Sequence, residues 1–107
     1  MEKVKEEATR QGFRVLHVHD VAETLKEKGF HAAPTAVVEV CNAGLASKAL
    51  AADRRAALLM PCRVVVQEDP AGSRLTALLP EDPSGGALKE LAQEVSARLK
   101  ALVDTAA

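Results

Sequence analysis

The residues best suited to chemistry in this sequence are its two cysteines, Cys41 and Cys62. Cys41 precedes Asn42, which is a favourable N-cap for a helix that begins at Ala43. A thiol near a helix N-terminus ionises more readily, because unpaired N–H groups and the helix dipole stabilise the thiolate. Cys41 is therefore a candidate nucleophilic, redox or sulfur-carrying thiol, with Cys62 as its resolving partner. Alternatively, both are small apolar side chains packed in the interior, where free cysteine is common.

Each cysteine also has a neighbour that shapes the backbone, Asn42 after Cys41 and Pro61 before Cys62. If their two strands are adjacent, the two motifs meet at one corner of a sheet. The thiols could then approach the Cα separation of under about 7 Å that a disulfide needs. The candidate ligand-binding residues are these four. The Asn42 amide could bind a ligand or only cap its helix, and Pro61 could shape a bulge beside a pocket or only interrupt a strand.

Two histidines, His17 and His19, stand two residues apart in a segment with strand spacing, so both side chains should face the same way. Strict alternation along residues 13–19 divides the side chains into one set, Phe13, Val15, His17 and His19, and another, Arg14, Leu16 and Val18. Paired imidazoles can bind a metal, with Cys41, Glu39 or a residue of a second subunit as a third ligand. The alternative is two half-exposed histidines on a solvent face.

The sequence contains no Walker-type loop, GxSxG elbow, HExxH or paired-cysteine zinc motif. We therefore lean away from an enzyme, and we expect no cofactor apart from such a metal. A net charge of -1, from 14 basic and 15 acidic residues, gives no field to attract phosphate backbones. Phe13 and Phe30 are the only aromatic residues, which leaves none for base stacking. Nucleic acid is therefore excluded as an expected partner.

Membrane insertion is not expected, because no apolar run approaches the length of a membrane span. The first twenty residues are charged throughout, which is unlike a signal peptide. The two cysteines are far apart and form no CxxC pair, which favours a reducing compartment. The expected location is the cytoplasm.

The hydrophobic pattern predicts one α+β domain over residues 1–107. It predicts helices over 2–11, 21–28, 43–52 and 88–102, and strands over 13–19, 35–41, 56–66 and 74–79. The long strand is interrupted at Pro61, where we expect a bulge or a sheet edge. A hairpin turn over 68–72 makes the last two strands antiparallel. A mostly antiparallel four-stranded sheet with helices packed mainly on one face buries this pattern.

Four segments of the chain match a family pattern: GFRVLHVHDV at 12–21, TLKEKG at 24–29, VCNAGLASKAL at 40–50 and ALLMPCRVVVQED at 57–69. They resemble the bacterial and archaeal family catalogued as domain of unknown function 302. Its members typically show alanine–cysteine–asparagine–proline before a helix, then a leucine-rich strand, proline–cysteine–asparagine and three valines. The resemblance implies a compact fold of TATA-binding-protein-like architecture and a tendency to form homodimers. It implies no established activity.

The sequence departs from this pattern in several places. Ala43 replaces the usual proline, Arg63 replaces the usual asparagine, and Glu39 stands at a usually small position. His17 and His19 are also unexpected. The family usually begins with a strand before the first helix, whereas this chain starts inside that helix. We therefore expect a sheet that lacks one edge strand, with unpaired backbone that a second subunit could cover.

The leading hypothesis is a small homodimeric binding or accessory domain without catalysis. Its partner would be an unidentified small molecule or protein, bound near the Cys41–Asn42 and Pro61–Cys62 motifs. Two alternatives remain. The first is a thiol protein of redox or sulfur-transfer chemistry that uses Cys41 and Cys62. The second is a metal-binding protein that uses His17 and His19.

Overall fold

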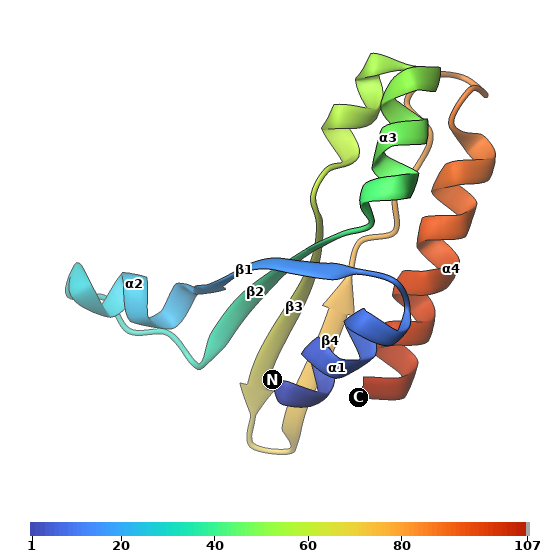
Figure 1. Cartoon of the computed structure of the whole chain (residues 1–107). Coiled ribbons are helices and arrows are strands. Elements are labelled where there is room, and N and C mark those ends of the chain that lie inside the picture. The colour runs from blue at the N-terminus through green and yellow to red at the C-terminus, as the bar shows by residue number, and fades with distance from the viewer. Residues whose placement is uncertain (107) are drawn as a thin grey trace.

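The computed structural model describes residues 1–106, so the last residue of the predicted domain lies outside the described part (Figure 1). In chain order the elements are α1 (Glu2–Arg10), β1 (Arg14–Asp20), α2 (Val21–Glu27), β2 (Thr35–Cys41), α3 (Ala43–Ala52), the 3₁₀ helix η1 (Arg54–Leu59), β3 (Cys62–Asp69), β4 (Gly72–Ala77) and α4 (Lys89–Ala106).

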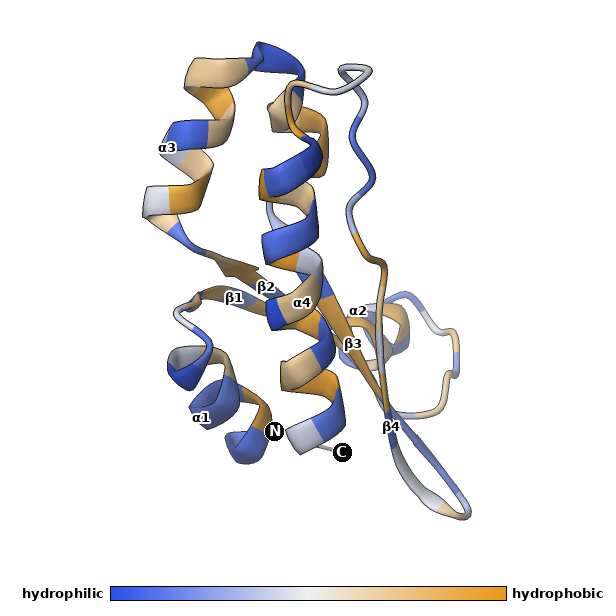
Figure 2. Ribbon diagram, turned by 90° about the vertical axis from the view of Figure 1, so that its right-hand side faces the viewer, coloured by the Kyte–Doolittle hydropathy of each residue, from blue (hydrophilic) through white to orange (hydrophobic). Residues whose placement is uncertain are grey.

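The strands form a single four-stranded sheet in the order β1-β2-β3-β4, and every neighbouring pair is antiparallel. Helices α1 and α4 pack beside each other on one face of this sheet (Figure 2). The core lies between these two helices and the sheet. It consists of Val4, Ala8, Phe13, Val38, Val40, Val64, Leu99 and Leu102. The predicted α+β class and the antiparallel four-stranded sheet are therefore confirmed.

Helix α2 lies on the other side of the sheet from α4, behind β3 in Figure 2. Its Val21 and Leu25 line a shallow groove together with Val37 and Glu39, which project from the face of β2 opposite α1 and α4. The helix begins at the predicted N-cap, because Asp20 accepts a hydrogen bond from the backbone N–H of Glu23 at 3.0 Å. Helices thus pack mainly, but not entirely, on one face.

The prediction of a strand from Ala56 onward is wrong. Residues Arg54–Leu59 form η1, and β3 begins only at Cys62, after the cis peptide bond between Met60 and Pro61. Proline has no N–H to give to a sheet, which is why the strand cannot extend back through Pro61. The expected bulge or edge at Pro61 is also absent, since the proline precedes an internal strand that lies between β2 and β4.

Strict alternation along β1 is wrong as well, because a bulge interrupts the pairing with β2 between Val15 and His17. Val15 pairs with Val40 and Val18 with Val38, so both valines point toward the core side. Leu16 is the additional residue, and it is half exposed. His17 and His19 still share one face, as predicted, but that face does not include Val15.

The final hairpin differs in its boundaries from the prediction. β3 continues to Asp69, and β4 starts at Gly72, so the turn contains only Pro70 and Ala71. β4 ends at Ala77, two residues earlier than predicted, and Leu78 is 89% exposed. The predicted last helix is confirmed and extends to Ala106.

Candidate functional site

The two cysteine motifs meet at one cavity of about 60 Å³, at the end of the sheet where β2 leads into α3 and η1 leads into β3. All four predicted ligand-binding positions border it: Cys41, Asn42, Pro61 and Cys62. The other lining residues come from β2, α3, η1, α4 and the segments that connect the elements: Phe13, Val40, Leu45, Ala46, Ala49, Ala56, Leu59, Met60, Pro80, Leu88, Leu91, Ala92 and Val95. The fold therefore brings these two sequence-distant motifs together.

The sheet register predicts different directions for the Cys41 and Cys62 side chains relative to the core. β2 and β3 pair Val40 with Cys62, so the Cys62 side chain is on the core side of the sheet with Val40. Cys41 follows Val40, and strict alternation would direct it to the opposite face. Cys41 is however the last residue of β2, where the chain turns into α3, and it borders the same cavity. Both cysteines are free and half-buried.

The surroundings of Cys62 favour its protonated form. Burial raises the pKa of this thiol, and the nearby Cys41 raises it further, while Arg63 opposes the shift. The Cys62 Sγ donates a long, weak hydrogen bond to the carbonyl oxygen of Leu59 at 3.9 Å. A thiol in this state contains little thiolate at neutral pH, so the structure does not support its use as a resolving thiol.

Asn42 connects two parts of the molecule. Its Oδ1 accepts a hydrogen bond from the Leu45 backbone N–H at 3.0 Å, which confirms the predicted helix cap. Its Nδ2 donates to the carbonyl oxygen of Gly12 at 2.9 Å, in the turn between α1 and β1. The guanidinium of Arg98 on α4 reaches the same turn and donates to the carbonyl of Gln11 at 3.0 Å. The Asn42 amide therefore fixes the corner that borders the cavity.

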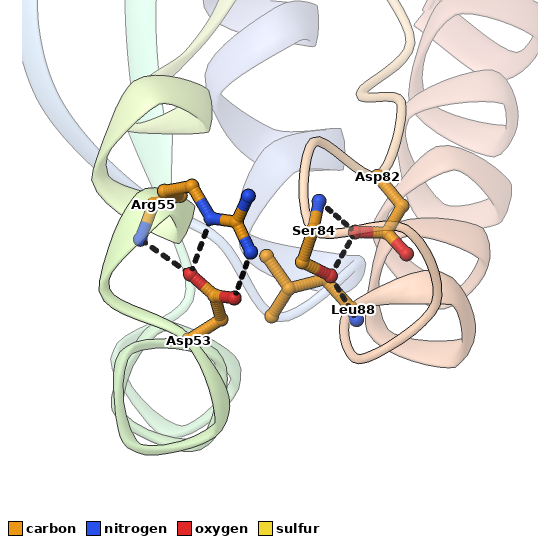
Figure 3. Close-up of polar contacts among 5 residues, drawn as sticks. All are labelled: Asp53, Arg55, Asp82, Ser84 and Leu88. Carbon is orange, nitrogen blue, oxygen red and sulfur yellow. Dashed lines mark hydrogen bonds and ion pairs between the residues drawn. The ribbon is translucent and has the colours of Figure 1, made fainter.

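Two polar clusters fix the backbone at the far end of the cavity (Figure 3). In the first, the Asp53 carboxylate accepts hydrogen bonds from the Arg55 backbone N–H at 2.9 Å and from its guanidinium at 3.0 and 2.7 Å. The hydrogen bonds from the Arg55 side chain, and then from its backbone, lower the pKa of Asp53 to about 2. Asp53 thus stabilises the start of η1. An aspartate just before a polar turn is the feature of the sequence that could have predicted this helix.

The second cluster forms the N-terminal end of α4. Asp82 accepts hydrogen bonds from the Ser84 hydroxyl and from the Ser84 backbone N–H, and the Ser84 Oγ in turn accepts one from the Leu88 N–H at 3.1 Å. The Ser84 hydroxyl is the main cause of a lowered Asp82 pKa. In Figure 3 the Arg55 side chain points toward this cluster. Together the two clusters hold Ala56 and Leu88, which line the cavity, in place.

The cavity wall is suited to a narrow range of ligands. Among the described residues, those that line it have no charged side chain, and most are aliphatic. The exceptions are the Phe13 ring, the Asn42 amide, whose two ends already make hydrogen bonds, and the sulfur-containing side chains of Cys41, Met60 and Cys62. Such a wall offers apolar surface and soft sulfur atoms, and it offers no acid–base pair for catalysis.

The histidine pair lies away from this cavity, on the face of the sheet opposite α1 and α4. The rings of His17 and His19 contact each other edge to face, with centroids 4.3 Å apart. The His19 Nε2 lies 2.9 Å from Oε1 of Glu39, the neighbour proposed as a third ligand. In residues 1–106, no set of three or more His, Cys, Asp or Glu side chains is arranged to hold a metal ion. The metal hypothesis for this pair therefore gains no support from the geometry.

Comparison with known proteins agrees with the fold and identifies the family. The model of the family described as "Domain of unknown function DUF302" matches residues 1–106, so the chain belongs to this family. The fold is also that of an uncharacterised conserved DUF302 protein from Bacillus stearothermophilus, whose crystal structure matches with a TM-score of 0.88 and 31% sequence identity. That match covers 99% of this chain and 87% of the other. The resemblance stated from the sequence is confirmed.

No curated protein matches the sequence, so no activity can be transferred from a relative. The family and the structural neighbour are themselves uncharacterised. Within the described residues, no helix has both the length and the apolar character needed to cross a bilayer.

Proposed function

We propose that this chain is a small non-catalytic binding domain whose ligand occupies the cavity between the Cys41–Asn42 and Pro61–Cys62 motifs. The observation that carries the proposal is the convergence of both motifs on that one cavity. Backbone on two of its sides is held by specific hydrogen bonds, from Asn42 at one corner and from Asp53 at the start of η1. A preformed apolar cavity is the usual site of a small ligand.

The size of the cavity limits the ligand. Its volume of about 60 Å³ is smaller than the roughly 150 Å³ of an engineered cavity that admits benzene. The ligand is therefore very small, or the cavity widens when α3 moves. Helix α3 packs more extensively on η1 than on α4, so α3 and η1 can move outward together without disturbing the core under α4.

Filling the cavity should abolish ligand binding. Ala46 is half-buried on α3 and lines the cavity, so Ala46→Leu places three extra carbon atoms inside it. We expect at least one of a panel of small apolar probes, including xenon, benzene and short alkanethiols, to raise the melting temperature of the parent protein. A probe at 100 times its Kd adds about 2.7 kcal/mol to the free energy of unfolding. In Ala46→Leu this increase should disappear.

The matched control is Ala51→Leu, the same substitution on the exposed side of the same helix. It should leave the probe-induced increase intact. The proposal fails if no probe stabilises the parent protein, or if the increase persists unchanged in Ala46→Leu.

We further propose that the domain acts as a homodimer. Two observations support this: α1 and α4 cover only one face of the sheet, and the aliphatic pair Val37 and Val65 lies on the other face. Both outer strands, β1 and β4, also leave one edge without a partner strand in the described sheet. Light scattering at micromolar concentration should give twice the 11.3 kDa mass of the chain. A monomer mass under these conditions would refute the dimer.

A further inference from the structure

We propose that the ligand of this cavity is a soft monovalent metal ion, Cu(I), held by the sulfur atoms of Cys41, Met60 and Cys62. The inference rests on the proposed function, because it names the ligand class of the same cavity. It differs from the histidine hypothesis in its residues, its place in the fold and the kind of metal.

The first support is the distribution of sulfur in the chain. The sequence has two cysteines and two methionines, and three of these four residues border this one cavity. The fourth, Met1, borders a separate groove beside β4. Met60 and Cys62 flank Pro61 at the start of β3, while Cys41 comes from the end of β2. Two sequence-distant segments thus bring two thiols and one thioether to a single small space.

The second support is the chemistry of the rest of the wall. The lining contains no carboxylate and no imidazole, so it offers nothing to hard cations such as Mg²⁺ or Ca²⁺. Structural Zn²⁺ sites need four nitrogen or sulfur ligands, and here only two thiols are available. Thiolate and thioether ligands together select Cu(I). An ion without its water shell also fits a cavity of about 60 Å³, which is too small for most organic ligands.

Binding is a ligand exchange without a redox step. A donor complex such as Cu(I)–bicinchoninate delivers the ion: the bonds from copper to bicinchoninate nitrogen break as the bonds from copper to sulfur form, and free bicinchoninate is released. Each thiol that forms a bond from sulfur to copper loses its proton to the buffer, and the Met60 thioether donates a lone pair without losing a proton. Copper remains Cu(I) throughout. With both thiolates bound, the site has a net charge of minus one, and the adjacent Arg63 side chain is the nearest cation in sequence.

The test is a Cu(I) titration of the untagged, fully reduced protein under anaerobic conditions, in competition with bicinchoninate. We expect one Cu(I) per chain, with near-ultraviolet absorption from sulfur-to-copper charge transfer. Met60→Leu conserves volume and should weaken binding about tenfold or more, and Cys41→Ser or Cys62→Ser should weaken it by more than about 100-fold. The control is Leu58→Val, because Leu58 lies on the same 3₁₀ helix, is 76% exposed and does not line the cavity, so this variant should retain the parent affinity.

Two further measurements apply to the wild-type chain and do not depend on the folding of any variant. X-ray absorption of the loaded protein should show only sulfur in the first coordination shell of copper. Cu(I) should also protect both thiols from iodoacetamide. The inference is overturned if bicinchoninate retains all the copper, if nitrogen or oxygen ligands dominate, or if His17→Gln and His19→Gln abolish binding while the sulfur variants do not.

The outcomes separate this inference from the proposed function. If apolar probes stabilise the protein and Ala46→Leu removes that effect, but Cu(I) does not bind, the binding-domain proposal stands and the copper site is refuted. If Cu(I) binds through sulfur and no apolar probe stabilises the protein, the copper site is supported. The proposal that the cavity binds small apolar molecules then fails.

Discussion

Leu99→Ala should lower the free energy of unfolding by about 3–4 kcal/mol, the largest single-residue loss that we expect in this chain. Leu99 lies on the inner side of α4 and is completely buried. It belongs to the cluster that joins the helix to Val38, Val40 and Val64 of the sheet. Removing its side chain leaves a void that the β-branched valines, stiff at χ1, cannot easily fill. Urea denaturation monitored by circular dichroism measures the loss.

The matched control for this prediction is Leu58→Ala, the same substitution on η1, where Leu58 is 76% exposed. It should change the free energy of unfolding by no more than about 0.5 kcal/mol. A comparable loss in both variants would mean that Leu58 is covered in solution, for example by a second subunit. A small loss in Leu99→Ala would instead contradict the packing of α4 against the sheet.

The same periodicity that identifies Leu99 explains why most of the fold could be predicted. Leu88, Ala92, Leu99 and Leu102 follow one stripe of a helix, and all four are buried. Alternation in β3 likewise separates buried Val64 from exposed Arg63. These patterns depend only on which side of an element faces the core. The same patterns are therefore expected in any fold that buries one side of each helix and strand.

Periodicity failed where a local contact determines the backbone. The run Ala56–Leu59 is apolar throughout but contains no β-branched residue, and the Asp53 carboxylate accepts a hydrogen bond from the N–H of Arg55 and starts a 3₁₀ helix instead of a strand. In β1 the bulge at Leu16 shifts the register by one residue, and no turn or proline in the sequence marks it. Local hydrogen bonds and register shifts change which side chain faces the core, and hydrophobicity alone does not encode them.

The sequence predicted that the two cysteine motifs lie close together, but it did not predict the geometry around them. Cys41 and Cys62 come together because β2 and β3 are neighbours, which follows from the topology. The sequence could not show that the register opposes Cys62 to Val40, or that Met60 completes a sulfur-rich wall. It also could not show that Arg98, 87 residues after Gln11, donates a hydrogen bond to the carbonyl of Gln11. Such contacts depend on how α4 crosses the sheet.

The hydrogen bond from Arg98 to the Gln11 carbonyl makes the adjacent Gly12 the second position where a small change should have a large effect. Gly12 has φ of +83°, which side chains other than glycine rarely adopt. A Cβ atom there would lie 2.5 Å from Arg98 Nη1 and 3.1 Å from Asn42 Nδ2. Gly12→Ala therefore strains the backbone and also displaces the Arg98 guanidinium from the Gln11 carbonyl. We expect the free energy of unfolding to fall by about 2–3 kcal/mol, the sum of both effects.

Gly29→Ala separates the two causes, because Gly29 has nearly the same φ of +84°, yet a Cβ added to it would meet no atom within 4 Å. It should cost only the backbone strain, about 1 kcal/mol. In an Arg98→Ala background the additional cost of Gly12→Ala should shrink toward that of Gly29→Ala, since the crowded guanidinium is then gone. Equal losses for Gly12→Ala and Gly29→Ala in the parent chain would show that Arg98 does not fix the turn. The Asn42 corner of the cavity would then depend on the two hydrogen bonds of Asn42 itself, to the Gly12 carbonyl and from the Leu45 N–H.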